Sequence, residues 1–538
     1  MFKKYRIEKP SLIVTIILSF CMILSSCTQA EKQEMPTEEI QRATSPSNIK
    51  LINALKTIIP HAMRYKGTPG LNIALARDGK VIWEAGFGYA DLEKGIPMTP
   101  ETVMHSGSMG KTYTATAIMQ LAEKGVIGID DSINKYLKEF QVTNPFGERD
   151  ITFRDLLTHR SGLTSNAAGS EFKAPKPLGE HLKEGYTQKT FKTYKGTLLP
   201  RWSAKVGKRF LYSNFGMATL GYLVEVTNPE GLSFSEYVQK NIMDPLGMSS
   251  SMYPPVQDAA HVRSDIFERF SSGYAQFGAI DIPTPNIYFA DYPAGTVVTT
   301  PGDHIRLLLA YLNKGTYNDY ELLKPETVEL MLTPQLDEAL GGTVSLGLTW
   351  MLENIGKYDF NFGHSGAHMY GWMNTFRAFP KQDFAVAIAT NHWAMQQNRY
   401  KEHRIIYSFI SSWLRSEELF VEQKTPASNW AWKTSYVVGL IMAEQLKGYL
   451  GIEGPVTSEM IESMAVGAKL RADAPNSSSG WDPDGFRAGM RDMLDVEMTL
   501  KAIQSFIASD QIKVTPEELR KIYKELGGEL PSVLFNWK

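Results

Sequence analysis

The sequence has very little cysteine. Only Cys21 and Cys27 occur among its 538 residues, and both lie near the start of the chain. Because Cys21 falls in a segment that we expect to be removed, the remaining chain would keep one thiol and form no internal disulfide. Its fold then depends on buried apolar side chains, and 43% hydrophobic residues over this length can supply the cores of two or three domains.

The sequence also has no excess of either charge. It contains 56 Lys and Arg residues against 58 Asp and Glu residues, a formal net charge of -2. This balance provides no general electrostatic attraction to nucleic acids or other polyanions. We therefore expect a small-molecule or peptide partner and no nucleic acid.

Long hydrophobic runs are missing except near the start. Residues 12–24 are apolar and follow a basic head, which is the pattern of a secretory signal, and they are fewer than the about 20 residues of a membrane span. Residues 24–27, Leu-Ser-Ser-Cys, resemble the lipobox of bacterial lipoproteins. This resemblance implies cleavage before Cys27 and its acylation. We expect residues 1–27 to be a lipoprotein signal, with the protein lipid-anchored in the cell envelope and facing the periplasm or exterior.

The rest of the chain divides by composition. Residues 28–48 are polar and nearly free of aromatic residues, which is typical of a linker. Residues 49–416 combine strand-like and helix-like patterns and are expected to form one domain. Residues 417–538 have helical periodicity only, so we expect a C-terminal helical region.

Strand patterns occur in two separated stretches of the expected domain. Residues 71–95 alternate around Asp78-Gly79, a dipeptide that favours a β-hairpin. Strand-like runs return at 347–355, 371–380 and 384–391, and the region between is mostly helical. The sequence therefore predicts an α+β fold of the α/β sandwich type, an antiparallel sheet flanked by helices with a large helical insertion.

The stretch "HSGSMGKTYTATAIMQLAEKG" places Ser108 three residues before Lys111 at the start of an apolar helical run. The same spacing occurs at Ser47, Ser132 and Ser170, so the spacing alone is a weak signal. At a helix start, however, residues three apart share a face, and their side chains can meet. The positive end of the helix dipole, together with burial, would lower the pKa of the amine and make it a base for the hydroxyl.

Two other motifs compete for this stretch. The "GKT" at 110–112 lacks the first glycine of a phosphate-binding loop, because His105 occupies that position, so we exclude nucleotide binding. The "SGSMG" at 106–110 differs by one residue from a nucleophile elbow, and no parallel-strand run precedes it. The elbow remains a weak alternative.

Three motifs follow one another along the chain: "SMGK" from Ser108, "YSN" from Tyr212 and "HSG" from His364. Together they resemble the three motifs of class C β-lactamases and their penicillin-binding, esterase and D-peptidase relatives. Segments such as "TFRDLLTHRSGL" at 152–163 look like this family's framework, and the resemblance extends over about 50–416. It implies the β-lactamase/transpeptidase fold and a serine hydrolase activity.

The resemblance implies a role for each matching residue. Ser108 would be the acylated nucleophile, Lys111 its base, and Tyr212 the phenol that relays protons to the leaving group and water. Asn214 would hold Lys111 and the substrate amide. Substrate and oxyanion contacts would come from the third motif and the residue after it, namely His364, Ser365, Gly366 and Ala367, with the amide N–H groups of Ser108 and Ala367 forming the oxyanion hole.

The third motif departs from the β-lactamase pattern, which has Lys where this chain has His364. An imidazole with a reference pKa near 6.5 is largely neutral at pH 7, and its charge would return as the pH falls. We therefore expect anionic β-lactams to be poor substrates. No carboxylate or third His accompanies His364 and His368, so we expect no metal site and no cofactor.

The most favoured interpretation is a membrane-anchored serine hydrolase acting through an acyl-enzyme on ester, amide or D-amino-acid peptide substrates. Two alternatives remain open. One is a penicillin-binding-like receptor that is acylated with little turnover, and the other is an acyltransferase that uses the same residues. The acyl group, the leaving group, the oligomeric state and the function of residues 417–538 do not follow from the sequence.

Overall fold

The computed structural model describes residues 35–414 except 44, 148, 165–169, 172–175, 193–197, 255–262, 278–279, 285–287, 337–343, 354–359, 369–370, 395–401, 404–405, 408 and 412. The chain divides into residues 1–36 and 37–538, and the description below concerns the second unit. The predicted signal segment with Cys27 and the predicted helical region 417–538 lie outside the described residues. Within the described part, no helix is both long enough and apolar enough to span a membrane.

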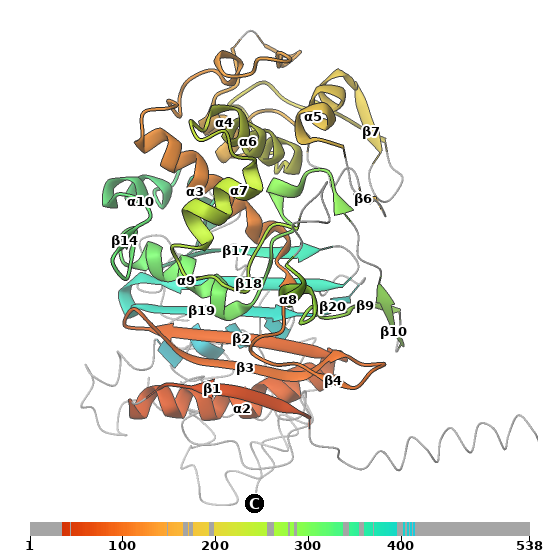
Figure 1. The fold of residues 1–538 in the computed structure, drawn as a ribbon, viewed down its shortest axis with the longest axis vertical. Coiled ribbons are helices and arrows are strands. Elements are labelled where there is room, and N and C mark those ends of the chain that lie inside the picture. The colour runs from red at the N-terminus through yellow and green to blue at the C-terminus, as the bar shows by residue number, and fades with distance from the viewer. Residues whose placement is uncertain are drawn as a thin grey trace, which may run out of the picture. The chain divides into compact units, whose positions relative to one another are not determined.

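A nine-stranded antiparallel sheet forms the centre of the fold (Figure 1). Its strand order is β1-β3-β2-β19-β18-β17-β16-β15, with β4 beside β3. The strands are β1 Thr37–Gln41, β2 Gly70–Arg77, β3 Lys80–Asp91, β4 Ile96–Pro97, β15 Val344–Leu346, β16 Met351–Glu353, β17 Asn361–His368, β18 Trp372–Phe379 and β19 Phe384–Thr390. Strands β2 and β19 join the early and late stretches, with register Arg77↔Phe384 to Leu71↔Thr390. The predicted sheet from two distant stretches is confirmed.

The hairpin between β2 and β3 turns at the expected dipeptide. Asp78 has φ of 52° and Gly79 has φ of 72°. Two consecutive residues in the left-handed region are typical of a type I′ turn, whose twist matches that of the two strands. Local sequence is therefore enough to specify this connection.

The chain between β3 and β15 forms the predicted helical insertion, which lies beyond β17 and contains α3, α4, α5, α6, α7 and α10 (Figure 1). Helix α9 packs against β2 and β19, so it connects the insertion to the sheet through one continuous apolar core. The helices are α2 Pro46–Lys66, α3 Gly110–Glu123, α4 Phe153–Leu157, α5 Leu178–Thr187, α6 Asn214–Thr227, α7 Phe234–Val238, α8 Ser264–Phe267, α9 Pro301–Leu312 and α10 Pro325–Met331.

Short elements complete the described fold. The helical turns are η1 Gly107–Met109, η2 Ile133–Lys135, η3 Gln239–Met243, η5 Tyr292–Ala294 and η6 Pro380–Gln382. The short strands are β5 Met104–His105, β6 Ser170–Glu171, β7 Thr190–Lys192, β8 Leu198–Pro200, β9 Gly273–Phe277, β10 Ile280–Thr284, β11 Tyr288–Phe289, β12 Val298–Thr299, β13 Thr316–Tyr317, β14 Tyr320–Glu321 and β20 His392–Ala394.

The predicted linker 28–48 is wrong over its second half. Residues 37–41 form the edge strand β1, which pairs with β3, and helix α2 begins at Pro46. An edge strand is held by its main chain, so its side chains can be polar and look like those of a linker. Here Glu39 also accepts a hydrogen bond from Trp83 Nε1 at 2.8 Å.

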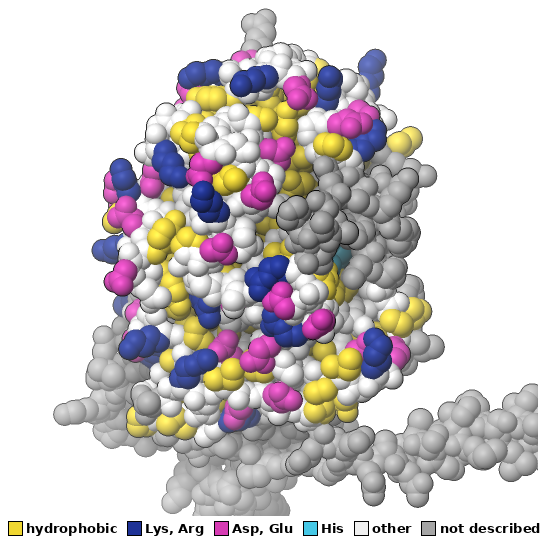
Figure 2. All heavy atoms as spheres, in the orientation of Figure 1, with side chains coloured by type: hydrophobic (Ala, Val, Ile, Leu, Met, Phe, Trp, Pro, Cys, Tyr) yellow, Lys and Arg dark blue, Asp and Glu magenta, His cyan; other side chains and the backbone are white. Residues whose placement is uncertain are grey.

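On the face shown in Figure 2, the described Lys and Arg side chains are interspersed with Asp and Glu side chains. This mixed surface agrees with the near balance of charges in the sequence. Any selective recognition of a charged ligand on this face then depends on local geometry rather than on a broad field of one sign.

Candidate active site

Ser108 lies in a tight turn that precedes a helix. The turn η1 spans Gly107–Met109, and α3 begins at Gly110, so the expected helix start lies two residues after Ser108. The Ser108 side chain is half-buried, whereas Lys111, on the first turn of α3, is fully buried. The serine is therefore accessible from solvent, and the lysine behind it is not.

The Lys111 amine makes two hydrogen bonds. Its Nζ lies 3.0 Å from Ser108 Oγ and 2.5 Å from the carbonyl oxygen of Ala294. Ala294 belongs to η5 and is 183 positions away in sequence. No sequence motif pointed to Ala294, because its contribution is a main-chain carbonyl that any residue type can provide.

Burial governs the charge of this amine. It lowers the pKa of Lys111 well below its ordinary value, and the nearby carboxylate of Asp291 opposes the shift only in part. A buried amine next to a hydroxyl can accept its proton only when the amine is neutral. The environment favours that neutral form.

The ring of Tyr212 lies next to the lysine amine. Lys111 Nζ is 4.8 Å from the centre of the Tyr212 ring. The second motif continues into α6, whose first residue is Asn214. Ser213 caps this helix, because its Oγ accepts a hydrogen bond from Gly216 N. The cap fixes where the helix starts and so where Tyr212 lies.

Asn214 does not hold the lysine as predicted. The hydrogen bonds described for Lys111 run to Ser108 and Ala294, and Asn214 Oδ1 is buried with no hydrogen-bond partner among the described residues. The second described partner of the Lys111 amine is the carbonyl oxygen of Ala294. Asn214 Oδ1 remains available to a ligand.

The third motif lies on β17, which has a strand on both sides only at its beginning. Strand β18 pairs with 362–368, but β16 pairs only with 361–363. From His364 onward η1 packs against β17, so the third motif faces the Ser108 turn. Ser365 and Ala367 are half-buried and lie on one face of the strand, whereas His364 and Gly366 are buried.

Two glycines let the Ser108 turn and β17 come together. A β-carbon at Gly366 would lie 1.9 Å from the Ser106 carbonyl oxygen and 3.0 Å from Ser108 N. A β-carbon at Gly107, where φ is +56°, would lie 2.6 Å from Ala367 N. Both positions therefore require glycine, and the contact brings the amide groups of Ser108 and Ala367 to one corner of the site.

His364 is more deeply buried than its sequence position suggested. Its Nδ1 lies 2.6 Å from the carbonyl oxygen of Ser365, and its Nε2 has no hydrogen-bond partner among the described residues. Burial, reinforced by Lys111 and Arg377, lowers the pKa of His364 to about 3. The expected return of its charge as the pH falls below 6.5 is therefore wrong, since a reference pKa takes no account of burial.

The remaining histidine of this strand has a packing role. The rings of His368 and His105 stack with centroids 4.0 Å apart and an interplanar angle of 4°. Among the described residues, no group of three or more His, Cys, Asp or Glu side chains is arranged to hold a metal ion.

The structure also distinguishes Ser108 from Ser132, another serine that lies three residues before a lysine. Ser132 caps η2, its Oγ donates to Asp150 at 2.5 Å, and Lys135 pairs with Asp131 instead of the serine. The two side chains therefore have separate carboxylate partners, and the lysine amine is exposed rather than buried beside the hydroxyl. The side chains of Lys50, Ser170 and Lys173 lie outside the described part of the structure.

Comparison with known proteins matches the stretch of the chain that contains the three motifs. The family model of the beta-lactamases matches residues 55–407. Protein flp of Staphylococcus aureus is 23% identical over 342 residues, which cover 63% of this chain and 62% of that protein. The chain thus matches less than two thirds of the length of this relative.

Two solved structures show the same fold. EstCE1, described as a hydrolase with promiscuous acyltransferase activity, aligns with a TM-score of 0.55 and 20% identity, covering 67% of this chain and 98% of that one. The D-amino acid amidase of Ochrobactrum anthropi SV3, in complex with D-phenylalanine, aligns with a TM-score of 0.52 and 19% identity, covering 70% of this chain and all of that one. At these identities the likeness concerns the fold alone.

Proposed function

This chain belongs to the beta-lactamase family, and from that premise we propose that it is a serine hydrolase that acts through an acyl-enzyme on ester, amide or D-amino-acid peptide substrates. One observation carries the proposal. A fully buried lysine amine, its pKa lowered by burial, lies 3.0 Å from the hydroxyl of a half-buried serine. Such a pair is the arrangement that activates a serine as a nucleophile.

In the proposed acylation step, Ser108 Oγ attacks the substrate carbonyl and its proton passes to Lys111 Nζ. The oxyanion is stabilised by the amide N–H groups of Ser108 and Ala367. Tyr212 relays the proton to the leaving group, whose departure forms the acyl-enzyme. In the second step a water molecule gives up a proton to the same groups and its oxygen attacks the acyl carbonyl. The bond between the acyl carbon and Ser108 Oγ then breaks, Oγ takes back the proton, and the acid is released.

The third motif and Asn214 bind the substrate in this proposal. The half-buried Ser365 and Ala367 lie beside Ser108 on the part of β17 that lacks a β16 partner, so substrate can contact them. Asn214 Oδ1, which has no partner among the described residues, would accept a hydrogen bond from the substrate amide. A buried polar atom without a partner is costly unless a ligand or water satisfies it.

Acyl transfer is a second candidate. The likeness to EstCE1, which is described as having promiscuous acyltransferase activity, supports it. An alcohol or amine that replaces water in the second step would use the same serine, lysine and tyrosine. The likeness to the D-amino acid amidase supports amides of D-amino acids as substrates.

We also propose that Cys27 carries a lipid anchor and that the enzyme lies in the cell envelope. The basis is the signal pattern and lipobox of residues 1–27. Residues 28–36 would then lead from the membrane to β1.

The proposal is tested by intact-mass analysis after exposure to activated esters, D-amino-acid amides and β-lactams. We expect an adduct of one acyl group with the unaltered chain and none with Ser108→Ala. Ser132→Ala is the matched control and should keep the adduct, because its hydroxyl lies away from any lysine partner. An adduct that persists in Ser108→Ala would contradict the proposed nucleophile, and an adduct that never decays would favour a receptor over an enzyme.

A further inference from the structure

One histidine contacts Tyr212 and both of its neighbours in sequence. The carbonyl oxygen of His159 accepts a hydrogen bond from Leu211 N at 2.8 Å, and its Nδ1 accepts one from Ser213 N at 3.1 Å. Between these bonds its ring packs against that of Tyr212, with centroids 4.5 Å apart and an angle of 40°. A single residue from a distant segment thus holds the main chain on both sides of the phenol.

The backbone of His159 closes the C-terminal end of helix α4. Its φ is +54°, the left-handed conformation that is common at the residue after a helix C-cap. His159 follows α4 by two residues and is 1% exposed. The amides of His159 and Arg160 donate to the carbonyl oxygens of Leu156 at 3.1 Å and Asp155 at 2.7 Å, so the end of α4 fixes the main chain of His159.

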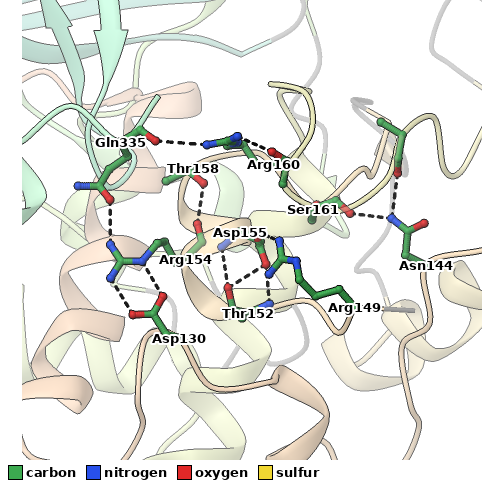
Figure 3. Close-up of polar contacts among 12 residues, drawn as sticks. Asp130, Asn144, Arg149, Thr152, Arg154, Asp155, Thr158, Arg160, Ser161 and Gln335 are labelled. Carbon is green, nitrogen blue, oxygen red and sulfur yellow. Dashed lines mark hydrogen bonds and ion pairs between the residues drawn. The ribbon is translucent and has the colours of Figure 1, made fainter. Parts of the chain in front are cut away.

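The residues on either side of His159 are firmly anchored (Figure 3). Arg160 donates from its guanidinium to the carbonyl oxygen of Gly207, and its own carbonyl accepts from Gly207 N at 2.7 Å. Thr158 Oγ1 donates to the carbonyl of Arg154, whose guanidinium pairs with Asp130 at 2.7 Å.

Further contacts hold helix α4 before His159 and the loop after it. Asn144 Nδ2 donates to the carbonyl of Ser161 at 3.1 Å, and Arg149 pairs with Asp155 at 2.8 Å (Figure 3). These polar contacts connect α4, the loop after it and the segment that leads to Tyr212. His159 therefore lies in a loop that is fixed at both ends.

The imidazole is held in one protonation state. Burial lowers the pKa of His159 well below its ordinary value, and Lys111 and His364 lower it further. Nδ1 faces a main-chain N–H donor, so the neutral ring carries its proton on Nε2. A protonated ring would set two donors against each other and lose the bond to Ser213.

We propose that His159 is a positioning residue that fixes Tyr212 for proton transfer, through the acceptor Nδ1 and the ring contact. The inference rests on the proposed function, because it assumes that the Tyr212 hydroxyl moves protons. It adds a residue of the "TFRDLLTHRSGL" segment to the site. His159 acts on the reaction only through Tyr212.

Three substitutions separate the features of the side chain. His159→Asn keeps an acceptor, since an amide oxygen can take the place of Nδ1, and asparagine tolerates a positive φ. His159→Gln carries its amide one carbon farther out, and His159→Ala removes the acceptor and the ring. We expect kcat for p-nitrophenyl butyrate to fall about 30-fold in the alanine and glutamine variants and less than about fivefold in the asparagine variant, with KM nearly constant.

A double-mutant cycle with Tyr212→Phe tests whether the effect passes through the phenol. Tyr212→Phe should lower kcat about 100-fold, the scale of a lost acid–base group, while keeping the ring that packs on His159. In that background His159→Ala should cost less than about threefold more, because no hydroxyl remains to be positioned. Effects that multiply to about 3000-fold would overturn the proposal, as would an asparagine variant no better than alanine.

A matched control accounts for loss of stability. His304 is another buried histidine, with Nδ1 2.5 Å from the Tyr113 hydroxyl, and it makes no described contact with Tyr212. His304→Ala should lower the melting temperature, yet its effect on kcat should be the same with and without Tyr212→Phe. Failure of the proposed function is recognised separately, because Ser108→Ala would then still hydrolyse the ester. If Ser108→Ala is inactive and the cycle is additive, only the role of His159 is refuted.

Discussion

The buried amine of Lys111 determines whether the chemistry suggested by the three motifs can occur. Its amine contacts a hydroxyl and a carbonyl, and the carboxylate of Asp291 is the nearby opposite charge that limits the fall of its pKa. Asp291 itself lies 2.7 Å from His181 Nε2. The protonation of the proposed base is therefore adjustable by residues that do not touch the substrate.

We expect a pH profile with an acidic limb that belongs to Lys111. The amine acts as a base only when neutral, so kcat/KM should rise with pH through the lowered pKa and level off well below 10.5. Asp291→Asn removes a negative charge that raises this pKa, so the limb should move to lower pH. Steady-state kinetics on an uncharged ester between pH 5 and pH 10 give the position of the acidic limb in the unaltered protein and in Asp291→Asn. A limb that stays in place, or that moves to higher pH, would contradict the assignment.

His364 should keep β-lactams poor substrates over the whole accessible pH range. With a pKa of about 3, the imidazole stays neutral at pH 5 as well as at pH 8, so the ratio of nitrocefin to ester turnover should not recover in acid. His364→Lys should raise that ratio by at most about tenfold to 100-fold at pH 8, the scale of a charge-assisted hydrogen bond of about 1.5 to 3 kcal/mol, because burial and Lys111 also lower the pKa of the new amine. A wild-type ratio that rises near pH 6.5 would show a solvated, titrating imidazole.

At the scale of elements, the contact between η1 and β17 is the geometry on which the site depends. The two backbones approach so closely that the three atoms nearest to a β-carbon at Gly366 would all be main-chain atoms, with the Ser106 carbonyl oxygen at 1.9 Å and Ser108 N at 3.0 Å. Main-chain atoms of a turn and a strand cannot move aside as the end of a long side chain can. The strand and the turn therefore have one relative position.

Gly366→Ala should abolish this contact. We expect kcat/KM to fall at least about 100-fold and stability to fall by about 1 to 3 kcal/mol, because the added methyl group pushes the Ser108 turn away from β17. Gly147→Ala is the matched control: a β-carbon there would have no neighbour closer than 3.9 Å, so activity and melting temperature should be unchanged. Full activity of Gly366→Ala would mean that the site does not need the observed approach of the two backbones.

At the scale of the whole molecule, the sheet holds together segments that are far apart in the chain. Strands β2 and β19 are adjacent although about 300 residues separate them, and the helical insertion returns to the sheet through α9. The Ser108 turn comes from the early stretch and the third motif from the late one. The proposed site therefore exists only in the complete fold of this domain.

Cys27→Ser tests the proposed anchor. The variant should move from the membrane to the soluble fraction, because the apolar run before Cys27 is shorter than a membrane span and no helix in the described part of the chain is long and apolar enough to cross one. Fractionation of cells that express each form measures this. A variant that is cleaved and still sediments with membranes would point to residues 417–538 as the membrane contact.

The sequence by itself determined the features that depend on neighbours along the chain. The Asp78-Gly79 turn, the alternation of β2 and β3 and the strands 372–379 and 384–390 follow from residue preferences within a few positions. The edge strand β1 was missed, since its polar side chains carry no sign of the backbone pairing that holds it. The order of three motifs was enough to identify the family, because the motifs consist of functional side chains. Side chains are visible in the sequence, whereas backbone contacts are not.

Only the tertiary structure decided what depends on residues distant in sequence. The Ala294 carbonyl beside Lys111, the two bonds of His159 around Tyr212 and the pKa of His364 all arise where separate segments meet. Main-chain groups are the same in every residue, so no pattern reveals which carbonyl will face an amine. Burial is likewise a property of the packed fold, and it moves a pKa by an amount that residue type alone does not contain.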